Sequence, residues 1–286
     1  MVSGEKAVRK PTRQAVMESV VSCKEIHSKF AAWDDEEWRR HIFASNDPYR
    51  IVEIVREIFS QPFDSRPIRV LDVGIGYGYV TKPILDHFGE HVEVSAIEHP
   101  SVERVQSGPF HSYLAENEVT VYRQNLETGI DIDDSFDVIV VGEVIEHLSP
   151  VVFRQVLGEL RSICDGYLLI TTPNILNVTN RRRLLFGSDI LDAPVIGDDE
   201  NSYNHIYLYS MNTLVEVLEE QGYGIERQRY LSAWPEKFRR AKLERNLAKI
   251  VYNLFEGQIQ RAFPRTRKRL LVLASVDKAD VADTDR

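Results

Sequence analysis

Cysteine is scarce in this sequence: its 286 residues include two cysteines, Cys23 and Cys164, which stand far apart. Their spacing argues against a disulfide framework and is not that of a metal site, so it favours a reducing compartment such as the cytoplasm. No apolar run is long enough to cross a bilayer, and the first residues lack the apolar core of a secretory signal. We also find no internal repeat and no low-complexity tract. These absences predict a globular cytoplasmic protein.

Positive charge is in the minority, because the formal net charge is −9, and this disfavours general binding to nucleic acids. The basic residues are nevertheless concentrated in one stretch. Between Arg227 and Arg269 there are thirteen Lys or Arg and three Glu. Two interpretations stay open: a solvated amphipathic helix, which is the commoner meaning of a charge run, or a surface for an anionic partner.

Hydrophobic periodicity indicates an α/β protein. The first sixty residues repeat apolar side chains at intervals of three and four, as in helices, whereas strands and helices alternate from Ile68 onward. Such alternation predicts a parallel sheet covered by helices on both faces. We divide the chain into a helical N-terminal cap (1–65), an α/β domain (66–276) that contains a substrate lid (174–209) and a basic helical insert before the last strand (232–264), and a disordered tail (277–286).

A glycine-rich turn follows the first predicted strand, in the sequence VLDVGIGYGYV. Its glycines, Gly74, Gly76 and Gly78, let the chain turn tightly and let a ligand approach the backbone. No Lys-Ser/Thr pair follows, which excludes a phosphate-binding P-loop. Asp72 would repel a pyrophosphate, but it suits a ligand with positive charge or with hydroxyl and amino donors. The second strand ends at Glu98, where an acid commonly binds ribose hydroxyls.

Two further strands lead into polar residues. The third precedes QNLE, so that Asn125 and Leu126 lie at the carboxyl edge of the sheet, where open α/β sheets bind ligands. The fourth strand runs directly into Glu143, Glu146 and His147 in the sequence FDVIVVGEVIEHL. If that turn is helical, these three side chains share one face.

Together, the segments VLDVGIGYG, VSAIEHP, RQNLE and FDVIVVGEVIEHL resemble the class I S-adenosylmethionine-dependent methyltransferases, over roughly residues 66 to 231 and the last strand. The resemblance implies a methyltransferase with a Rossmann-like seven-stranded sheet, whose last strand is antiparallel, and with S-adenosylmethionine as cofactor. The cofactor-binding residues that it implies are Asp72, Gly74, Ile75, Gly76, Gly78, Glu98, His99, Asn125, Leu126 and Glu143. The family more often has Asp where Asn125 stands.

Three interpretations of Glu143, Glu146 and His147 stay open. In the first, His147 is the general base that removes a proton from a substrate hydroxyl; EVIEHL resembles the ubiquinone-biosynthesis, sugar and natural-product O-methyltransferases. In the second, the three side chains bind Mg²⁺ or Mn²⁺ together with His205, as a resemblance to the small-RNA 2′-O-methyltransferases implies. In the third, Glu143 contacts the cofactor while the other two order the loop.

The stretch TTPNILNVTNRRRLLFG resembles methyltransferases of polysaccharide and glycolipid assembly. This likeness implies an acceptor hydroxyl on a glycan, a glycolipid or another small metabolite, and so a place in glycan biosynthesis. Residues suited to bind an anionic group or to stack on a sugar or aromatic acceptor are Arg181, Tyr203, His205 and Tyr207. The alternatives are a metal-dependent RNA 2′-O-methyltransferase and a cofactor-binding scaffold without catalysis.

The basic insert also has an apolar helix face, formed by Phe238, Leu243, Leu247, Ile250, Val251 and Leu254. We expect this face to pack on its own domain or on a second copy in a homodimer. Association with an anionic membrane surface is the second expectation, and it would make the protein peripheral to the membrane. Nucleic acid is a less expected partner.

Overall fold

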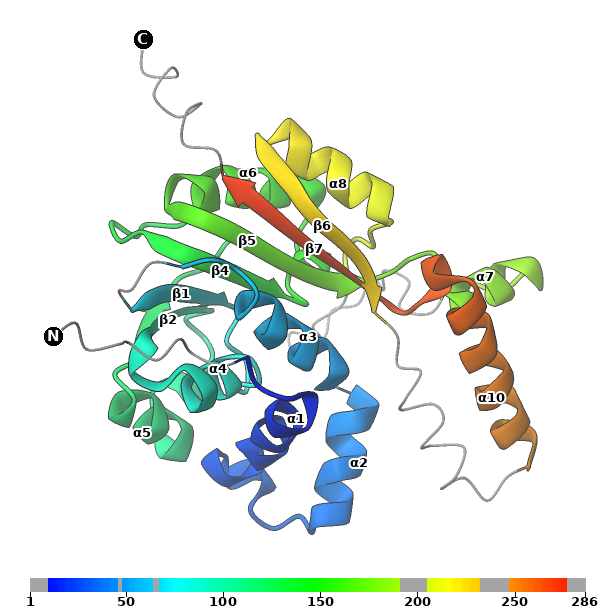
Figure 1. Cartoon of the computed structure of the whole chain (residues 1–286), viewed down its shortest axis with the longest axis horizontal. Coiled ribbons are helices and arrows are strands. Elements are labelled where there is room, and N and C mark those ends of the chain that lie inside the picture. Colours follow the sequence, from blue (N-terminus) through cyan, green and yellow to red (C-terminus); the bar gives the residue numbers. More distant parts are fainter. Residues whose placement is uncertain (1–9, 46–47, 64–66, 191–204, 232–246, 277–286) are drawn as a thin grey trace, which may run out of the picture. The chain divides into compact units, whose positions relative to one another are not determined.

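The computed structural model describes residues 10–45, 48–63, 67–190, 205–231 and 247–276 (Figure 1). The chain divides into two compact units: unit 1 is Met1–Val140 with Glu159–Leu168, and unit 2 is Val141–Gly158 with Leu169–Arg286. Several sequence predictions lie outside the described residues, namely those on Tyr203, on the first part of the basic insert with Phe238 and Leu243, and on the tail 277–286.

A seven-stranded sheet is the framework of the fold. Its hydrogen-bonded neighbours follow the order β3-β2-β1-β4-β5-β7-β6. The strands are β1 (Ile68–Val73), β2 (Val92–Glu98), β3 (Thr120–Arg123), β4 (Phe136–Gly142), β5 (Cys164–Pro173), β6 (Tyr223–Leu231) and β7 (Arg269–Val276). Strands β1, β2 and β3 pair in parallel, whereas β6 and β7 pair antiparallel. The predicted Rossmann-like sheet with an antiparallel final strand is therefore confirmed.

Unit 1 holds the N-terminal helices next to the first three strands. Its helices are α1 (Arg13–Ser22), α2 (Asp35–Ser45), α3 (Pro48–Ile58), α4 (Thr81–Phe88) and α5 (Gly108–Glu116). Helix α1 packs against α3 and α4, and α4 packs against β2. Helix α3 buries the apolar face that its periodicity predicts. Helix α5 begins at Gly108, after a separate 3₁₀ turn at Glu103–Val105, and it has Pro109 in its first turn.

Unit 2 contains α7 (Val178–Leu185), α8 (Met211–Glu220) and α10 (Leu247–Ala262), while α6 (Pro150–Ser162) continues from it into unit 1. Helix α8 is capped by Ser210, whose hydroxyl accepts the Thr213 N–H at 3.2 Å. It packs on β6 and β7. Helix α7 lies within the predicted lid, and α10 is the described part of the predicted basic insert.

Helix α10 corrects one expectation about that insert. Val251, from the predicted apolar face, is 58% exposed and the adjacent Phe255 is 64% exposed, whereas Glu256 and Gln260 are buried. Among the side chains of α10 that the structure describes, Glu256 and Gln260 thus point inward, whereas Val251 of the predicted apolar face is exposed and Leu254 is half-buried. None of the described helices has the length and apolar character needed to span a membrane.

Candidate active site

The glycine turn after β1 is built on left-handed backbone. Gly74, Gly76 and Gly78 have φ angles of 75°, 55° and 68°, which side chains other than glycine adopt at a cost. A Cβ added to Gly78 would meet the Phe110 ring at 2.8 Å, so this glycine is needed for packing. A Cβ added to Gly76 would meet, among the described residues, the carbonyl oxygen of Gly74 at 3.8 Å and nothing closer. The turn at Gly76 therefore faces open space that a ligand can use.

Glu98, at the end of β2, fixes this turn. One carboxylate oxygen accepts the Gly76 N–H at 3.0 Å and the other accepts the His99 N–H at 2.9 Å. Arg104 supports the arrangement, because its Nε donates to the Gly76 carbonyl at 2.7 Å and its guanidinium lies 3.7 Å from the Glu98 carboxylate. The acid predicted to bind ribose is thus held in place by the turn itself.

The N-terminal helices also contact the turn within unit 1. His27 donates its Nε2–H to the Tyr77 carbonyl over 2.9 Å, and the rings of Phe30 and Tyr77 lie 5.3 Å apart. Burial lowers the pKa of His27, which keeps the imidazole neutral at physiological pH. Sequence reasoning missed both His27 and Arg104, because nothing in their local patterns connects them to a turn that is distant along the chain.

Asp72 is buried at the end of β1. Its carboxylate accepts the Thr81 hydroxyl at 2.7 Å. Burial is the main reason that its pKa rises to about 6, and the nearby charge of Glu98 also raises it, while Thr81 and Arg50 oppose the shift. A carboxylate in this position can accept a hydrogen bond from a cationic ligand, and a cation would favour its ionised form.

The raised pKa of Asp72 predicts a pH dependence of stability. Below about pH 4 the carboxyl is protonated in both the folded and the unfolded chain. Between about pH 4 and 6 the unfolded chain loses this proton while the folded chain keeps it, so the free energy of unfolding falls by about 3 kcal/mol. Asp72→Asn should abolish this part of the fall in chemical denaturation across that range. Asp133→Asn, at an exposed position, is the control and should keep the wild-type pH dependence. An equal pH dependence in wild type and Asp72→Asn would contradict the assignment of this fall to Asp72.

The remaining cofactor candidates of unit 1 differ in their surroundings. Ile75 is buried, whereas the His99 side chain is exposed and pairs through Nδ1 with the Ser101 hydroxyl at 2.7 Å. Asn125 lies just beyond β3, and its side-chain oxygen accepts the Glu127 N–H at 3.0 Å. Leu126, beside it, is half-buried. The structure therefore brings together Asp72, the glycines and Glu98 most closely.

A second group of predicted residues follows β4 in unit 2. Glu143 has a φ of 60°, so the chain leaves the strand through a left-handed residue. Its N–H donates to the Thr171 carbonyl at 2.9 Å, and its carboxylate lies 2.7 Å from Nε of Arg269. The turn continues as a short 3₁₀ helix, Ile145–His147. Glu143 therefore precedes the helical turn and is not in helical register with Glu146 and His147.

Glu146 is buried within this turn, and it brings the later histidine close. Its carboxylate accepts the Thr172 hydroxyl at 3.0 Å. Its backbone carbonyl accepts the N–H groups of Ile206 at 2.7 Å and Tyr207 at 3.1 Å, which places His205 beside the turn. Burial, followed by the charge of Glu143, raises the pKa of Glu146 to about 8. Burial and the neighbouring carboxylate thus both favour the protonated form of Glu146.

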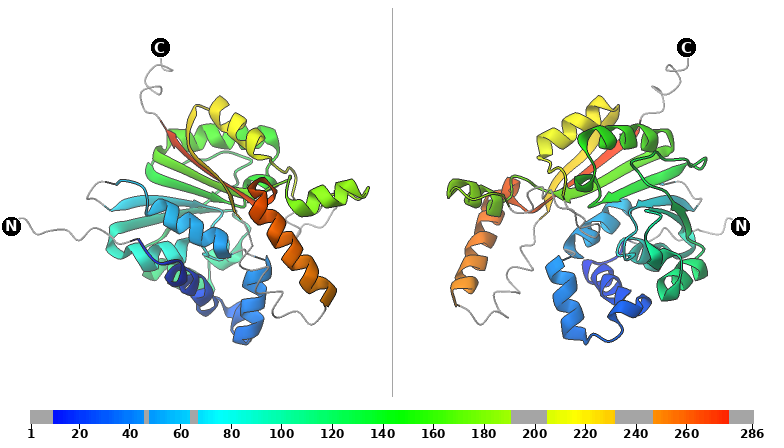
Figure 2. Two further views of the ribbon diagram at one scale, coloured as in Figure 1. Left: turned by 45° about the vertical axis from the view of Figure 1, so that its right-hand side comes forward. Right: turned by 180° about the vertical axis from the view of Figure 1, so that it is seen from behind.

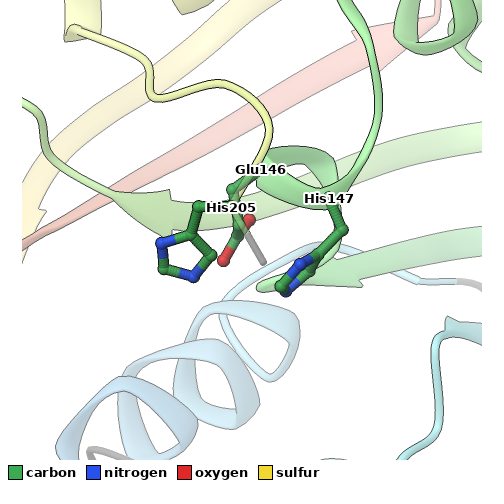
Figure 3. A group of neighbouring side chains, drawn as sticks. All are labelled: Glu146, His147 and His205. Carbon is green, nitrogen blue, oxygen red and sulfur yellow. The ribbon is translucent and has the colours of Figure 1, made fainter. Parts of the chain in front are cut away.

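Glu146, His147 and His205 converge (Figure 3). One nitrogen or oxygen from each lies within 4.8 Å of those of the other two, and the imidazole rings are 5.1 Å apart. Nδ1 of His205 is buried without a hydrogen-bond partner among the described residues. We call these three residues the histidine cluster. It offers two imidazoles that can accept a proton, or one oxygen and two nitrogen ligands for a cation.

Comparison with known proteins decides the class of this chain. Residues 43–228 match the family model described as a methyltransferase domain. The chain belongs to this methyltransferase family. The family and the seven-stranded fold together place the chain among the class I S-adenosylmethionine-dependent methyltransferases, as the resemblance of its four segments implies.

Its relatives are distant. A ubiquinone biosynthesis O-methyltransferase of Rickettsia felis is 26% identical over 145 residues, which cover 50% of this chain and 56% of that protein. Magnesium protoporphyrin IX methyltransferase from Synechocystis PCC 6803, solved with bound SAH, has a TM-score of 0.55 at 13% identity, covering 91% of this chain and 100% of that one. A glycopeptide N-methyltransferase has a TM-score of 0.51 at 16% identity, covering 82% and 92%. The two solved structures show the fold.

Substrate candidates of the methyltransferase lie in two segments of unit 2. Arg181, in α7, is exposed and donates Nε to the Leu176 carbonyl at 2.7 Å. Tyr207 is 38% exposed and packs edge-on against the buried Tyr209 ring at 4.9 Å. His205 belongs to the histidine cluster, and Tyr207 follows it two residues later.

Sequence reasoning also missed two residues that control the charge of this region. Arg269 begins β7 and pairs with Glu143, and Thr172 near the end of β5 donates to Glu146. Both residues belong to strands whose sequences show no sign of a functional site. Only the folded sheet brings them into contact with the EVIEHL turn. The sequence predicted Glu143 as a fourth cation ligand beside Glu146, His147 and His205. In the structure Glu143 pairs with Arg269 instead and is not part of the histidine cluster.

Proposed function

We propose that this methyltransferase transfers the methyl group of S-adenosylmethionine to a hydroxyl of a small aromatic molecule, with the histidine cluster as proton acceptor. The observation that carries the proposal is the convergence of His147 and His205 on the buried Glu146. The relative that is named an O-methyltransferase also supports oxygen as the acceptor atom.

The reaction needs a base but no redox partner. The substrate oxygen attacks the methyl carbon and forms the C–O bond, while the C–S bond breaks and its electron pair stays on sulfur. The hydroxyl proton passes to an imidazole of the cluster, His147 in our assignment. Bound S-adenosylmethionine supplies the activated methyl group, and the glycine turn with Glu98 would hold its ribose and methionine parts.

The chemistry of an imidazole base favours a phenolic hydroxyl over a sugar hydroxyl. A phenol has a pKa near 10, whereas an alcohol resembles water, whose pKa is about 16. A neutral imidazole, with a pKa of about 6.5, is matched more closely to the phenol. The exposed side chains of Ile206 and Tyr207, which follow His205, also offer apolar surface for an aromatic ring.

A metal-assisted variant is the second candidate, because the histidine cluster has the composition of a cation site. With Glu143 paired to Arg269, the cluster provides one carboxyl oxygen and two imidazole nitrogens. This donor set suits Mn²⁺ better than Mg²⁺, which prefers oxygen ligands. A bound cation would lower the pKa of a coordinated sugar or ribose hydroxyl, so it fits the glycan or RNA 2′-O acceptors predicted above.

Transfer of a labelled methyl group to three acceptor classes tests the proposal. We would supply a catechol-type phenol, an oligosaccharide and an RNA oligonucleotide, each with EDTA and with added Mn²⁺, and locate the label by mass spectrometry. We expect methylation of the phenol oxygen that EDTA does not reduce. Methylation of sugar or ribose hydroxyls that requires Mn²⁺ would replace the proposal with the metal-assisted variant. Cofactor binding without transfer to any acceptor would favour the scaffold.

A further inference from the structure

Helix α7 ends in a run of exposed apolar side chains. Leu184, Leu185 and Phe186 are 59%, 79% and 77% exposed, and they follow directly on Arg181–Arg183. Three consecutive large apolar residues in contact with water are unusual on a monomeric protein and indicate a binding surface. Successive helix residues point about 100° apart, so this run is apolar around most of the helix circumference.

Helix α10 adds further exposed apolar residues in the same unit. These residues are Val251 and Phe255, together with Phe263 just beyond the end of the helix. The side chain of Phe263 is 63% exposed. The opposite side of the helix is polar: Gln260 Nε2 donates to the Glu256 carboxylate at 3.0 Å, and the Thr179 hydroxyl of α7 donates to the same oxygen at 3.3 Å. This buried network joins the two helices, which lie together in both views of Figure 2.

The large apolar residues that are exposed on these two helices or directly after them are together called the α7–α10 surface: Leu184, Leu185, Phe186, Val251, Phe255 and Phe263. Positive charge accompanies them. Arg181 and Arg182 are exposed on α7, and Arg261 and Arg265 are exposed at the end of α10, while Glu256 is buried in the network between the helices. A chain of net charge −9 thus presents arginines next to its exposed apolar residues. Such a combination attracts an anionic partner with an apolar interior.

From these observations we infer that the α7–α10 surface binds the interface of an anionic lipid bilayer. The Leu184–Phe186 run enters the boundary between headgroups and acyl chains, and the arginines pair with lipid phosphates. A lipid bilayer fits this surface better than a second copy of the chain does. Fluid lipid can surround the apolar end of α7 on most of its sides, whereas the rigid face of a second protein would cover only one side. The inference is independent of the proposed acceptor.

Vesicle sedimentation tests this inference on the intact protein. We expect binding to vesicles of phosphatidylcholine with a minor fraction of phosphatidylglycerol, weaker binding without phosphatidylglycerol, and release at high salt. Replacing Leu185→Asp together with Phe186→Asp should weaken the partitioning at least about tenfold. Both side chains are largely exposed, so the variant should fold, and its thermal unfolding should match that of wild type.

A matched control is available on the same unit. Val151, in α6, is 77% exposed and stands outside the α7–α10 surface, so Val151→Asp should leave vesicle binding unchanged. Failure of the wild-type protein to bind anionic vesicles would overturn the inference. Light scattering on the same samples detects the competing case: a dimer that Leu185→Asp/Phe186→Asp converts to monomer, without any vesicle binding, would identify the surface as an interface between two copies.

Discussion

Gly76→Val should weaken S-adenosylmethionine binding by roughly 100-fold while the protein stays folded. The backbone at Gly76 has a φ of 55°, its N–H is held by Glu98, and no atom of the described residues lies within 3.8 Å of an added Cβ. A valine side chain would occupy the space that we assign to the ligand, and overpacking of this kind costs about 1–3 kcal/mol. Isothermal titration calorimetry with S-adenosylmethionine measures the loss.

Two other glycines separate this effect from backbone strain. Gly187 also has a positive φ, of 69°, and, its chain neighbours aside, no atom of the described residues lies within 4 Å of an added Cβ, so Gly187→Val carries a similar strain without touching the ligand. Its binding of S-adenosylmethionine should equal that of wild type. Gly78→Ala should instead lower the melting temperature, because the Phe110 ring stands 2.8 Å from the new Cβ. Undiminished binding by Gly76→Val would contradict the placement of the cofactor at this turn.

His147→Ala should reduce kcat by about 10²- to 10⁴-fold and leave the affinity for S-adenosylmethionine unchanged. In the proposed reaction, His147 accepts the substrate proton beside the buried Glu146, and it has no assigned part in holding the cofactor. Single-turnover kinetics with a methylated phenol as product would measure the loss. His111→Ala removes an exposed imidazole on α5 and is the matched control, with activity expected to equal that of wild type.

Glu146→Gln distinguishes the two candidate roles of the cluster. Glutamine resembles the protonated carboxyl that burial favours, so the variant should keep more activity than His147→Ala if an imidazole is the base. If a cation is required, glutamine replaces a carboxylate ligand and both variants should lose comparable activity, with partial rescue by excess Mn²⁺. Near-normal turnover by His147→Ala would remove His147 as the base and leave it an ordering role.

The sheet and the glycine turn were predictable from the sequence because their causes are local. Alternating strand and helix patterns, the glycines after β1 and the acid ending β2 are each visible within a few residues. His205 was predicted from a resemblance, and the structure does place it beside His147. The left-handed φ of Glu143 and its ion pair with Arg269 were not predictable, because they depend on strand packing that no local pattern encodes.

Helix α10 shows a different limit of the sequence pattern. Apolar residues repeated at helical intervals are normally assigned to the buried face. In this helix the buried face is formed by Glu256 and Gln260, whose hydrogen bonds satisfy each other and Thr179, so Val251 and Phe255 face outward. The helical repeat shows which apolar residues share a face of the helix. Whether that face is buried or exposed depends on contacts with other parts of the fold, which the repeat does not encode.

A crystal structure with bound S-adenosylhomocysteine tests the central claim most directly. The account predicts that the ribose hydroxyls lie within hydrogen-bonding distance of Glu98 and that the ligand passes over Gly76. A ligand bound away from Glu98 and the glycine turn would contradict it.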